Sequence, residues 1–290
     1  MAAAERARTE VTRRPSRRAS GFWPTSPTLL LLMVFFVAPV LGLLLRSVLD
    51  PQLGMQNYAE MLGSTTYLRI FVNTFLVATI VTAVTLLLAF PVAWFLAVAP
   101  RRWASLLFAI IILSMWTNLL TRTYAWMVLL QNTGIINKTL IAWGLIASPL
   151  PLINNLTGVT IGMTYIMLPF MVLPLQGTIR TIDPAILRAA SLCGANRLQV
   201  FTKVFLPLVV PGVGAGVLMV FVMSLGYFVT PALLGGTSNM MLAEFIAQLV
   251  QSLLNWGLAG AAAMILLAVS LGIYAIQFRF FRVKTVGQVE

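Results

Sequence analysis

Residues that could carry out catalysis are scarce in this chain of 290 residues. It has no His, one Cys (Cys193), and only 7 Asp and Glu residues. That set offers no catalytic constellation, no disulfide within the chain and no Cys/His metal site. A Gly-Lys-Ser/Thr phosphate-binding loop is also missing, so any ATP that drives the protein would be bound by another subunit. We therefore expect neither enzymatic activity nor a cofactor.

The residues best suited to binding are mostly aromatic. Aromatic faces attract cations through cation–π contacts worth ~0.5–2 kcal/mol each, although ordinary packing is the alternative for each of them. Two acidic residues, Asp50 and Glu244, fall outside the long apolar segments, where a solvated loop charge is expected. Such a charge could touch a binding protein or attract cations. The candidates for a substrate path are Trp116, Asn118, Tyr124, Tyr165, Tyr227 and Glu244.

The elements that must position these residues are membrane spans. Apolar residues make up 60% of the chain and charged residues 9%, whereas soluble domains carry about 25% charged residues. A bilayer core is crossed by about 20 apolar residues in a helix. We predict an all-α membrane protein with a domain at 26–282, between a disordered basic tail at 1–25 and a second tail at 283–290. The six predicted spans are 27–48, 70–98, 103–124, 157–178, 208–230 and 257–278.

The placement of basic residues orients these spans. The predicted outer segments hold only Arg46, Arg69, Arg122 and Lys138, and all other Lys and Arg residues fall on the opposite side. The positive-inside rule therefore predicts that both termini are cytoplasmic. The net charge of +12 is explained by topology and by attraction to anionic lipid, rather than by nucleic-acid binding.

The inner loop at 179–207 has a sequence unlike that of the spans around it. Asp183 is a good N-cap for a short helix, and Gly194 supplies the left-handed residue that ends one. A second short helix is expected to begin at Arg197 and to stop at Pro207. The sequence therefore predicts two short helices joined by a bend.

The spacing in this loop resembles the "EAA" loop of bacterial ABC importer permeases. The family pattern is Glu-Ala-Ala, three residues, Gly, nine residues, Ile, one residue, Leu-Pro. Here Arg188 stands in place of the Glu, which inverts the charge, and Val204 stands in place of the Ile. In the family this loop is the coupling helix that docks into a groove on the cytoplasmic ATPase. The resemblance assigns that role to Asp183, Arg188, Ala189, Ala190, Gly194, Val204, Leu206 and Pro207.

Other residues are similar to the spermidine/putrescine permease group. They are Asn57-Tyr58, Trp116-Thr117-Asn118 with Arg122 and Tyr124, Met167–Leu175, and Thr230–Gly236. Iron, phosphonate and opine permeases share parts of these patterns. The resemblance implies a type I importer fold with six transmembrane helices and cytoplasmic coupling helices, in a bacterial inner membrane. It also implies two ATPase subunits, a second permease that is homologous or identical, and an external substrate-binding protein.

The expected function is therefore that of a permease subunit in an ATP-driven importer for polyamines. One alternative is the same class of importer with another cargo, such as ferric ion, a phosphonate or an opine. A secondary transporter or channel is the alternative from a different class. It is disfavoured because the predicted spans contain no Asp or Glu that could relay protons.

Overall fold

The computed structural model describes residues 22–280. Most of the predicted basic tail, 1–25, lies outside the described residues, but residues 22–25 already belong to the first helix. The predicted C-terminal tail, 283–290, lies wholly outside them. Every regular element in the described part of the chain is a helix, in agreement with the predicted all-α class.

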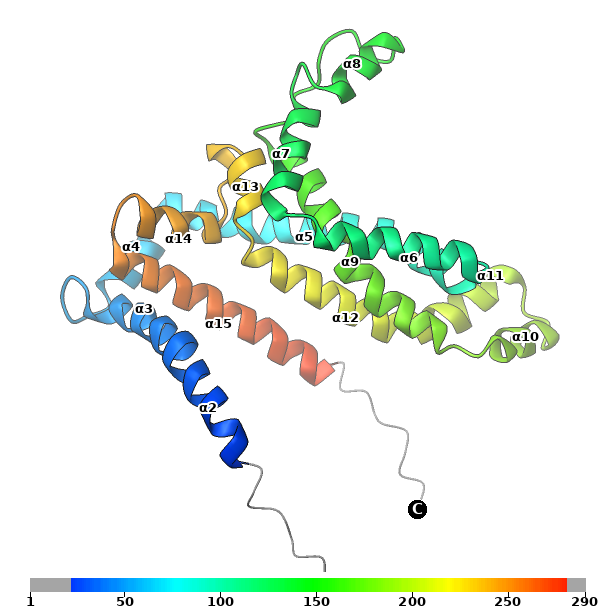
Figure 1. Ribbon diagram of the computed structural model, residues 1–290, viewed down its shortest axis with the longest axis horizontal. Coiled ribbons are helices and arrows are strands. Elements are labelled where there is room, and N and C mark those ends of the chain that lie inside the picture. The colour runs from blue at the N-terminus through cyan, green and yellow to red at the C-terminus, as the bar shows by residue number, and fades with distance from the viewer. Residues whose placement is uncertain (1–21, 281–290) are drawn as a thin grey trace, which may run out of the picture.

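The long apolar runs form the helices of an elongated bundle (Figure 1). A helix satisfies its own backbone hydrogen bonds, which a bilayer core cannot do for it, so apolar runs of this length adopt this form. Five helical segments are long enough to cross a membrane, and a bent pair supplies up to a sixth. The elements that build these segments are α2 (Phe22–Leu32), η2 (Met33–Val37), α3 (Ala38–Leu49), α5 (Thr65–Val98), α6 (Arg101–Trp116), α7 (Leu119–Leu130), α9 (Leu156–Arg180), α12 (Leu206–Leu225) and α15 (Trp256–Phe280).

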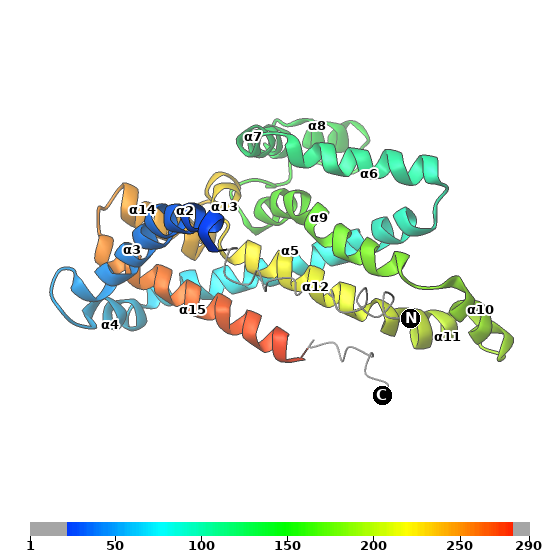
Figure 2. The same cartoon turned by 60° about the horizontal axis from the view of Figure 1, so that its bottom comes forward.

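Shorter helices lie in the connections between the long ones or, in the case of α11 and η3, continue directly into α12. They are α4 (Gln56–Gly63), α8 (Ile135–Ala142), α10 (Pro184–Leu192), α11 (Arg197–Gln199), η3 (Val200–Phe205), α13 (Val229–Leu234), η4 (Thr237–Asn239) and α14 (Leu242–Gln251). Figures 1 and 2 show α10 and α11 at one end of the bundle, and α4 and α14 at the other. The two ends of the molecule therefore carry different sets of short helices.

The third predicted span, 103–124, contains a sharp bend at the place where Asn118, Thr121, Arg122 and Thr123 interrupt its apolar run. The helical axis turns by 101° between Arg101–Trp116 and the segment Leu119–Ala142. Thr117 and Asn118 have extended backbones, and the Asn118 side chain accepts a hydrogen bond from the N–H of Leu120 at 2.9 Å. This side chain caps α7 and so starts a new helix at Leu119.

The predicted helix stop at Pro207 is wrong. The chain is helical from Arg197 to Leu225 without a break, so the loop helix and the fifth span are one helix. The residues before Leu206 form the π-helix η3. Its wider turn lets the helix continue through Pro207, which has no N–H to donate to the preceding turn. The predicted span at 208–230 in turn ends early, at Leu225, and its last residues lead into the separate helix α13.

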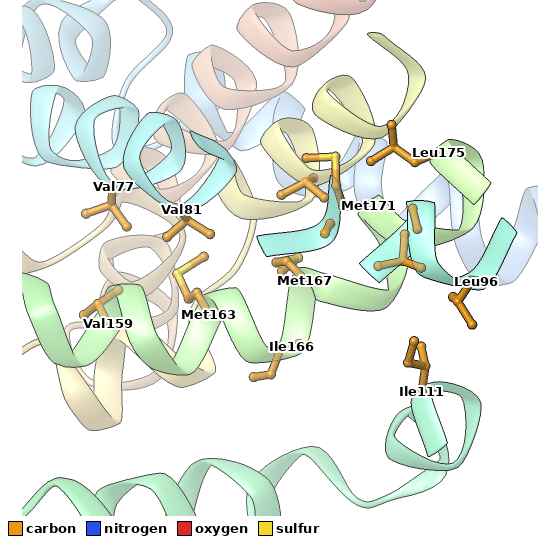
Figure 3. Packing of buried hydrophobic residues seen from close by; sticks show 14 of the residues in the cluster. Val77, Val81, Leu96, Ile111, Val159, Met163, Ile166, Met167, Met171 and Leu175 are labelled. Atoms are coloured by element: carbon orange, nitrogen blue, oxygen red, sulfur yellow. The ribbon is translucent and has the colours of Figure 1, made fainter. Parts of the chain in front are cut away.

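Helix α9 lies at the centre of the bundle, packed against both α5 and α12. One face of α9 presents Met163, Met167 and Met171, all fully buried, and α5 contributes Val77 and Val81 to the same core (Figure 3). Methionine side chains are flexible enough to fill irregular gaps between helices. This core fixes the position of the segments that extend from both ends of α9.

Small residues permit the closest contacts between helices. A Cβ atom on Gly216 of α12 would lie 2.7 Å from the sulfur of Met171 on α9. A Cβ atom on Gly260 of α15 would lie 2.5 Å from the carbonyl oxygen of Leu43 on α3. Both seams therefore depend on the absence of a side chain.

Candidate functional site

The first half of the 179–207 loop folds as the sequence predicts. The Asp183 side chain accepts a hydrogen bond from the N–H of Ala185 at 2.8 Å and so caps α10. Gly194 has φ +87°, and the next N–H, of Ala195, donates to the carbonyl oxygen of Ala190 at 3.2 Å. This bond spans six residues and closes the helix end, as in a Schellman motif.

The second half of the loop is anchored to α5 by aromatic side chains. The rings of Phe205 and Trp94 lie 4.4 Å apart, and Phe201 stacks on Phe205 at 5.7 Å. At the same end of the bundle, the Arg180 guanidinium donates to the carbonyl oxygen of Leu96 at 3.3 Å. These contacts hold the base of the segment against α5.

The tip of this segment is exposed. Leu192 is 89% exposed, and Arg188 and Ala189 are also exposed on α10. Ala190 and Val204 are half-buried, while the remaining predicted coupling residues, Asp183, Gly194, Leu206 and Pro207, are exposed. An exposed leucine beside small residues on a short, firmly capped helix is suited to insertion into a groove on another protein.

Two of the predicted path residues lie where α7, α9 and α13 meet. The hydroxyl of Tyr227 lies near Thr230 and the guanidinium of Arg122. Thr230 is fully buried, and its hydroxyl oxygen lies 3.4 Å from that of Thr123 on α7. On the neighbouring face of α9, the ring of Tyr165 packs edge-on against Trp126 of α7 at 5.6 Å.

Three other path candidates lie in exposed positions around the bend. Trp116, at the end of α6, is 85% exposed, and Tyr124 on α7 is half-exposed. Asn118 is used as the cap of α7. Within this single chain these three residues mark the bend between α6 and α7, whereas Tyr165 and Tyr227 are packed against their neighbours.

The expectation that Glu244 is a solvated loop charge is wrong. Glu244 lies in the first turn of α14 and is only 8% exposed. Burial raises the pKa of its carboxyl, while a hydrogen bond with the backbone of Met241 acts in the opposite direction. Asp50, by contrast, is half-exposed and lies 3.9 Å from the guanidinium of Arg46.

The sequence did not single out the residues that complete these contacts. Trp126 belongs to an apolar run, in which an aromatic residue is unremarkable. Thr123 follows the polar residues Thr121 and Arg122, and nothing in the sequence distinguishes it from them. Thr230 belongs to the Thr230–Gly236 stretch that resembles spermidine/putrescine permeases, but that resemblance predicts no contact for its side chain. A Thr in an apolar span that lies near a helix break is the signal that could have pointed to them, because its hydroxyl must find a partner.

Known proteins are similar to most of this chain, although no protein-family model matches it. The spermidine/putrescine transport system permease protein PotB of Escherichia coli is 34% identical over 224 residues, covering 77% of this chain and 81% of that protein. PotB of Haemophilus influenzae is 33% identical over 223 residues, covering 76% and 78%. The chain belongs to the ABC importer permease family. A further member, the inner membrane ABC transporter permease protein YdcU of E. coli, is 32% identical over 197 residues, covering 64% and 63%.

Solved structures show the fold of this permease family. A bacterial ABC transporter involved in the import of the acidic polysaccharide alginate matches with a TM-score of 0.68 and 20% identity, covering 89% of this chain and 93% of that one. The alginate transporter in complex with an alginate-bound periplasmic protein matches with a TM-score of 0.73 and 18% identity, covering 89% and 92%. This permease therefore has the importer fold that its sequence resembles.

Proposed function

We propose that this permease carries polyamines such as putrescine or spermidine through a bacterial inner membrane. The observation that supports this cargo is the identity of 34% over 224 residues with a spermidine/putrescine permease. The aligned residues make up 77% of this chain and 81% of that permease. Exposed aromatic rings at the α6–α7 bend suit a long flexible cation, because cation–π contacts are weak enough to release it.

The 179–207 segment is proposed to couple the permease to a separate ATPase. Its support is the family spacing together with the exposed, firmly capped helix α10. Under this proposal α10 and both termini are cytoplasmic, and α4 and α14 face the outside, where a substrate-binding protein would dock. The complete importer would contain two ATPase subunits and a second permease, either homologous or identical.

The deciding experiment for the cargo is uptake by cells that express this permease with its ATPase, partner permease and binding protein. Labelled putrescine, spermidine, ferric ion and aminoethylphosphonate are supplied in parallel. Uptake of either polyamine that depends on ATP supports the proposal. Uptake of iron or phosphonate without either polyamine would reject the cargo and leave the importer class intact. Uptake that continues without the ATPase would instead favour a secondary transporter or channel.

The coupling role has its own test at Arg188. This side chain carries a positive charge on the exposed face of α10 where the family pattern has Glu, so the docking surface should be acidic or neutral there. Arg188→Glu should weaken pull-down of the ATPase more than Arg188→Ala does. Arg101→Ala, at the exposed start of α6, is the matched control and should leave assembly unchanged. Equal assembly of all three variants would remove Arg188 from the proposed contact.

A further inference from the structure

The carboxyl group of Glu244 is held in a fixed place at the end of the bundle that carries α4 and α14 (Figure 1). The N–H of Leu242, the first residue of α14, donates to the hydroxyl oxygen of Thr74 on α5 at 2.8 Å. The side chain of Asn73 donates to the carbonyl oxygen of Ser238 just before α14 at 3.0 Å. Two residues of α5 therefore fix the start of α14, and with it the first turn that carries Glu244.

The Glu244 carboxyl lacks the partner that a buried charge requires. Its Oε2 atom is buried and has no hydrogen-bond partner among the described residues. Within residues 22–280 the one ion pair joins Arg46 and Asp50, so no Lys or Arg of this part of the chain neutralises Glu244. A buried carboxyl without a counter-charge either keeps its proton or binds a cation, so this position favours a cationic partner over an empty, ionised state.

The helices packed against α14 bring no cation close to this carboxyl. The charged residues on α5 and α15 are Arg69 and Arg279, both exposed, and Arg279 lies at the opposite end of its helix. Helix α13 carries no titratable side chain. The first turn of α14 itself favours a negative charge, because the free N–H groups of a helix start point toward it.

A metal ion fits this position poorly. Calcium needs six to eight oxygen ligands and magnesium nearly ideal octahedral coordination, whereas Glu244 offers one free carboxylate oxygen. The described residues contain no group of three His, Cys, Asp or Glu side chains that could hold a metal. A primary ammonium needs fewer oxygens, and its three N–H donors can bond one carboxylate and nearby carbonyl groups.

We propose that Glu244 is a binding site for a protonated primary amine of the cargo, at the outer end of its path through the permease. This inference rests on the proposed function. A primary ammonium on an unbranched alkyl chain is narrow enough for a carboxyl that is only 8% exposed. A Lys of a partner subunit offers the same group, and the assembly measurement below distinguishes the two. The alkyl portion would lie against the apolar side chains of α14, and the ammonium would supply the missing partner of Oε2.

The test is uptake of labelled putrescine by the complete importer with Glu244→Gln or Glu244→Asp in this chain. Gln keeps the size of the side chain and removes its charge, whereas Asp keeps the charge and shortens the chain. Glu244→Gln should lower uptake about tenfold or more, as expected for loss of one charge-assisted hydrogen bond. Glu244→Asp should retain the larger share. Arg101→Gln, which removes an exposed charge at the start of α6, away from α14, is the control and should match the wild type.

Pull-down of the importer subunits is measured alongside uptake. Normal assembly with the Gln variant impaired and the Asp variant active supports the inference. Normal uptake by the Gln variant, or an Asp variant that is more impaired than the Gln variant, would overturn it, because packing rather than charge would then matter. Loss of assembly with Gln would also overturn it and would assign Glu244 to a subunit contact. If the wild type takes up no polyamine, the proposed cargo itself fails, which is a separate result.

Discussion

The side chain of Thr74 on α5 joins two parts of the chain that are 168 residues apart, because its hydroxyl accepts a hydrogen bond from the N–H of Leu242 at 2.8 Å. The same hydroxyl donates to the carbonyl oxygen of Ile70 at 2.7 Å, and Thr74 is 1% exposed. A helix start leaves its first N–H groups unpaired, so this hydroxyl supplies from another helix what α14 lacks in its own sequence.

Thr74→Val should destabilise the start of α14. Valine has nearly the shape of threonine but cannot accept a hydrogen bond, so the Leu242 N–H would be buried without a partner at a cost of about 1–3 kcal/mol. The melting temperature of the purified complex should fall for Thr74→Val and stay close to the wild type for Thr74→Ser. Thr79→Val is the control, because the Thr79 hydroxyl bonds only to its own helix, at Phe75. Equal melting temperatures for Thr74→Val and Thr79→Val would contradict this role.

Gly212→Val should separate α12 from α9. A Cβ atom on Gly212 would clash with the side chain of Thr178 and lie 3.2 Å from the carbonyl oxygen of Pro174. Overpacking of this kind costs about 1–3 kcal/mol, so the variant should melt earlier and assemble less well. Gly272→Val on α15 is the matched control, because its Cβ would meet nothing within 4 Å. Equal melting temperatures for Gly212→Val and Gly272→Val would show that α9 and α12 are not tightly packed at Gly212.

Gly194→Ala should weaken coupling through backbone strain alone. Gly194 has φ +87°, and nothing lies within 4 Å of the position that a Cβ would occupy, so the substitution adds no clash. A left-handed conformation costs a non-glycine residue about 1–2 kcal/mol, which would disturb the turn after α10. Substrate-stimulated ATP hydrolysis by the complex should fall for Gly194→Ala and less for Gly194→Asn. Gly177→Ala, inside α9 with equally free space, should leave it unchanged.

The parts of the fold that local sequence determines could be predicted. The length of the apolar runs predicts the long helices. The N-cap residue Asp183 and the left-handed Gly194 predict the two ends of α10. The polar residues from Asn118 to Thr123 indicated an interruption of the third span. They did not reveal the turn of 101°, because that turn depends on a single Asn side chain that starts the new helix. The stop expected at Pro207 failed because a π-turn before it carries the helix through.

Burial of Glu244 could not be predicted, because it depends on contacts between distant parts of the chain. Helix α14 is too short to be recognised as a span, so its one charge was interpreted as solvated. Its position is set by Asn73 and Thr74, which lie near the start of an apolar run on α5. A long-range bond to a backbone N–H leaves no pattern in the sequence.

The state of Glu244 in the absence of cargo should be visible as a pH dependence of stability. Burial raises the pKa of its carboxyl above the ordinary value of 4.5, with the Met241 backbone hydrogen bond opposing, and α14 lies outside the spans. The folded protein then binds a proton that the unfolded chain has already lost. Stability should therefore fall as the pH rises from 4.5 through the raised pKa, by at most about 1.4 kcal/mol per pH unit, and level off above it.

Melting temperatures of the purified complex, wild type against Glu244→Gln, measure this effect, because all other titrating groups are common to the two proteins. The wild type should lose stability relative to the variant as the pH rises through that window. Added putrescine should restore more of the wild-type stability above the window than below it, since an ammonium binds the carboxylate and not the neutral acid. Parallel curves for the two proteins across the whole range would mean that Glu244 carries the same charge folded and unfolded, which its burial does not permit without a partner.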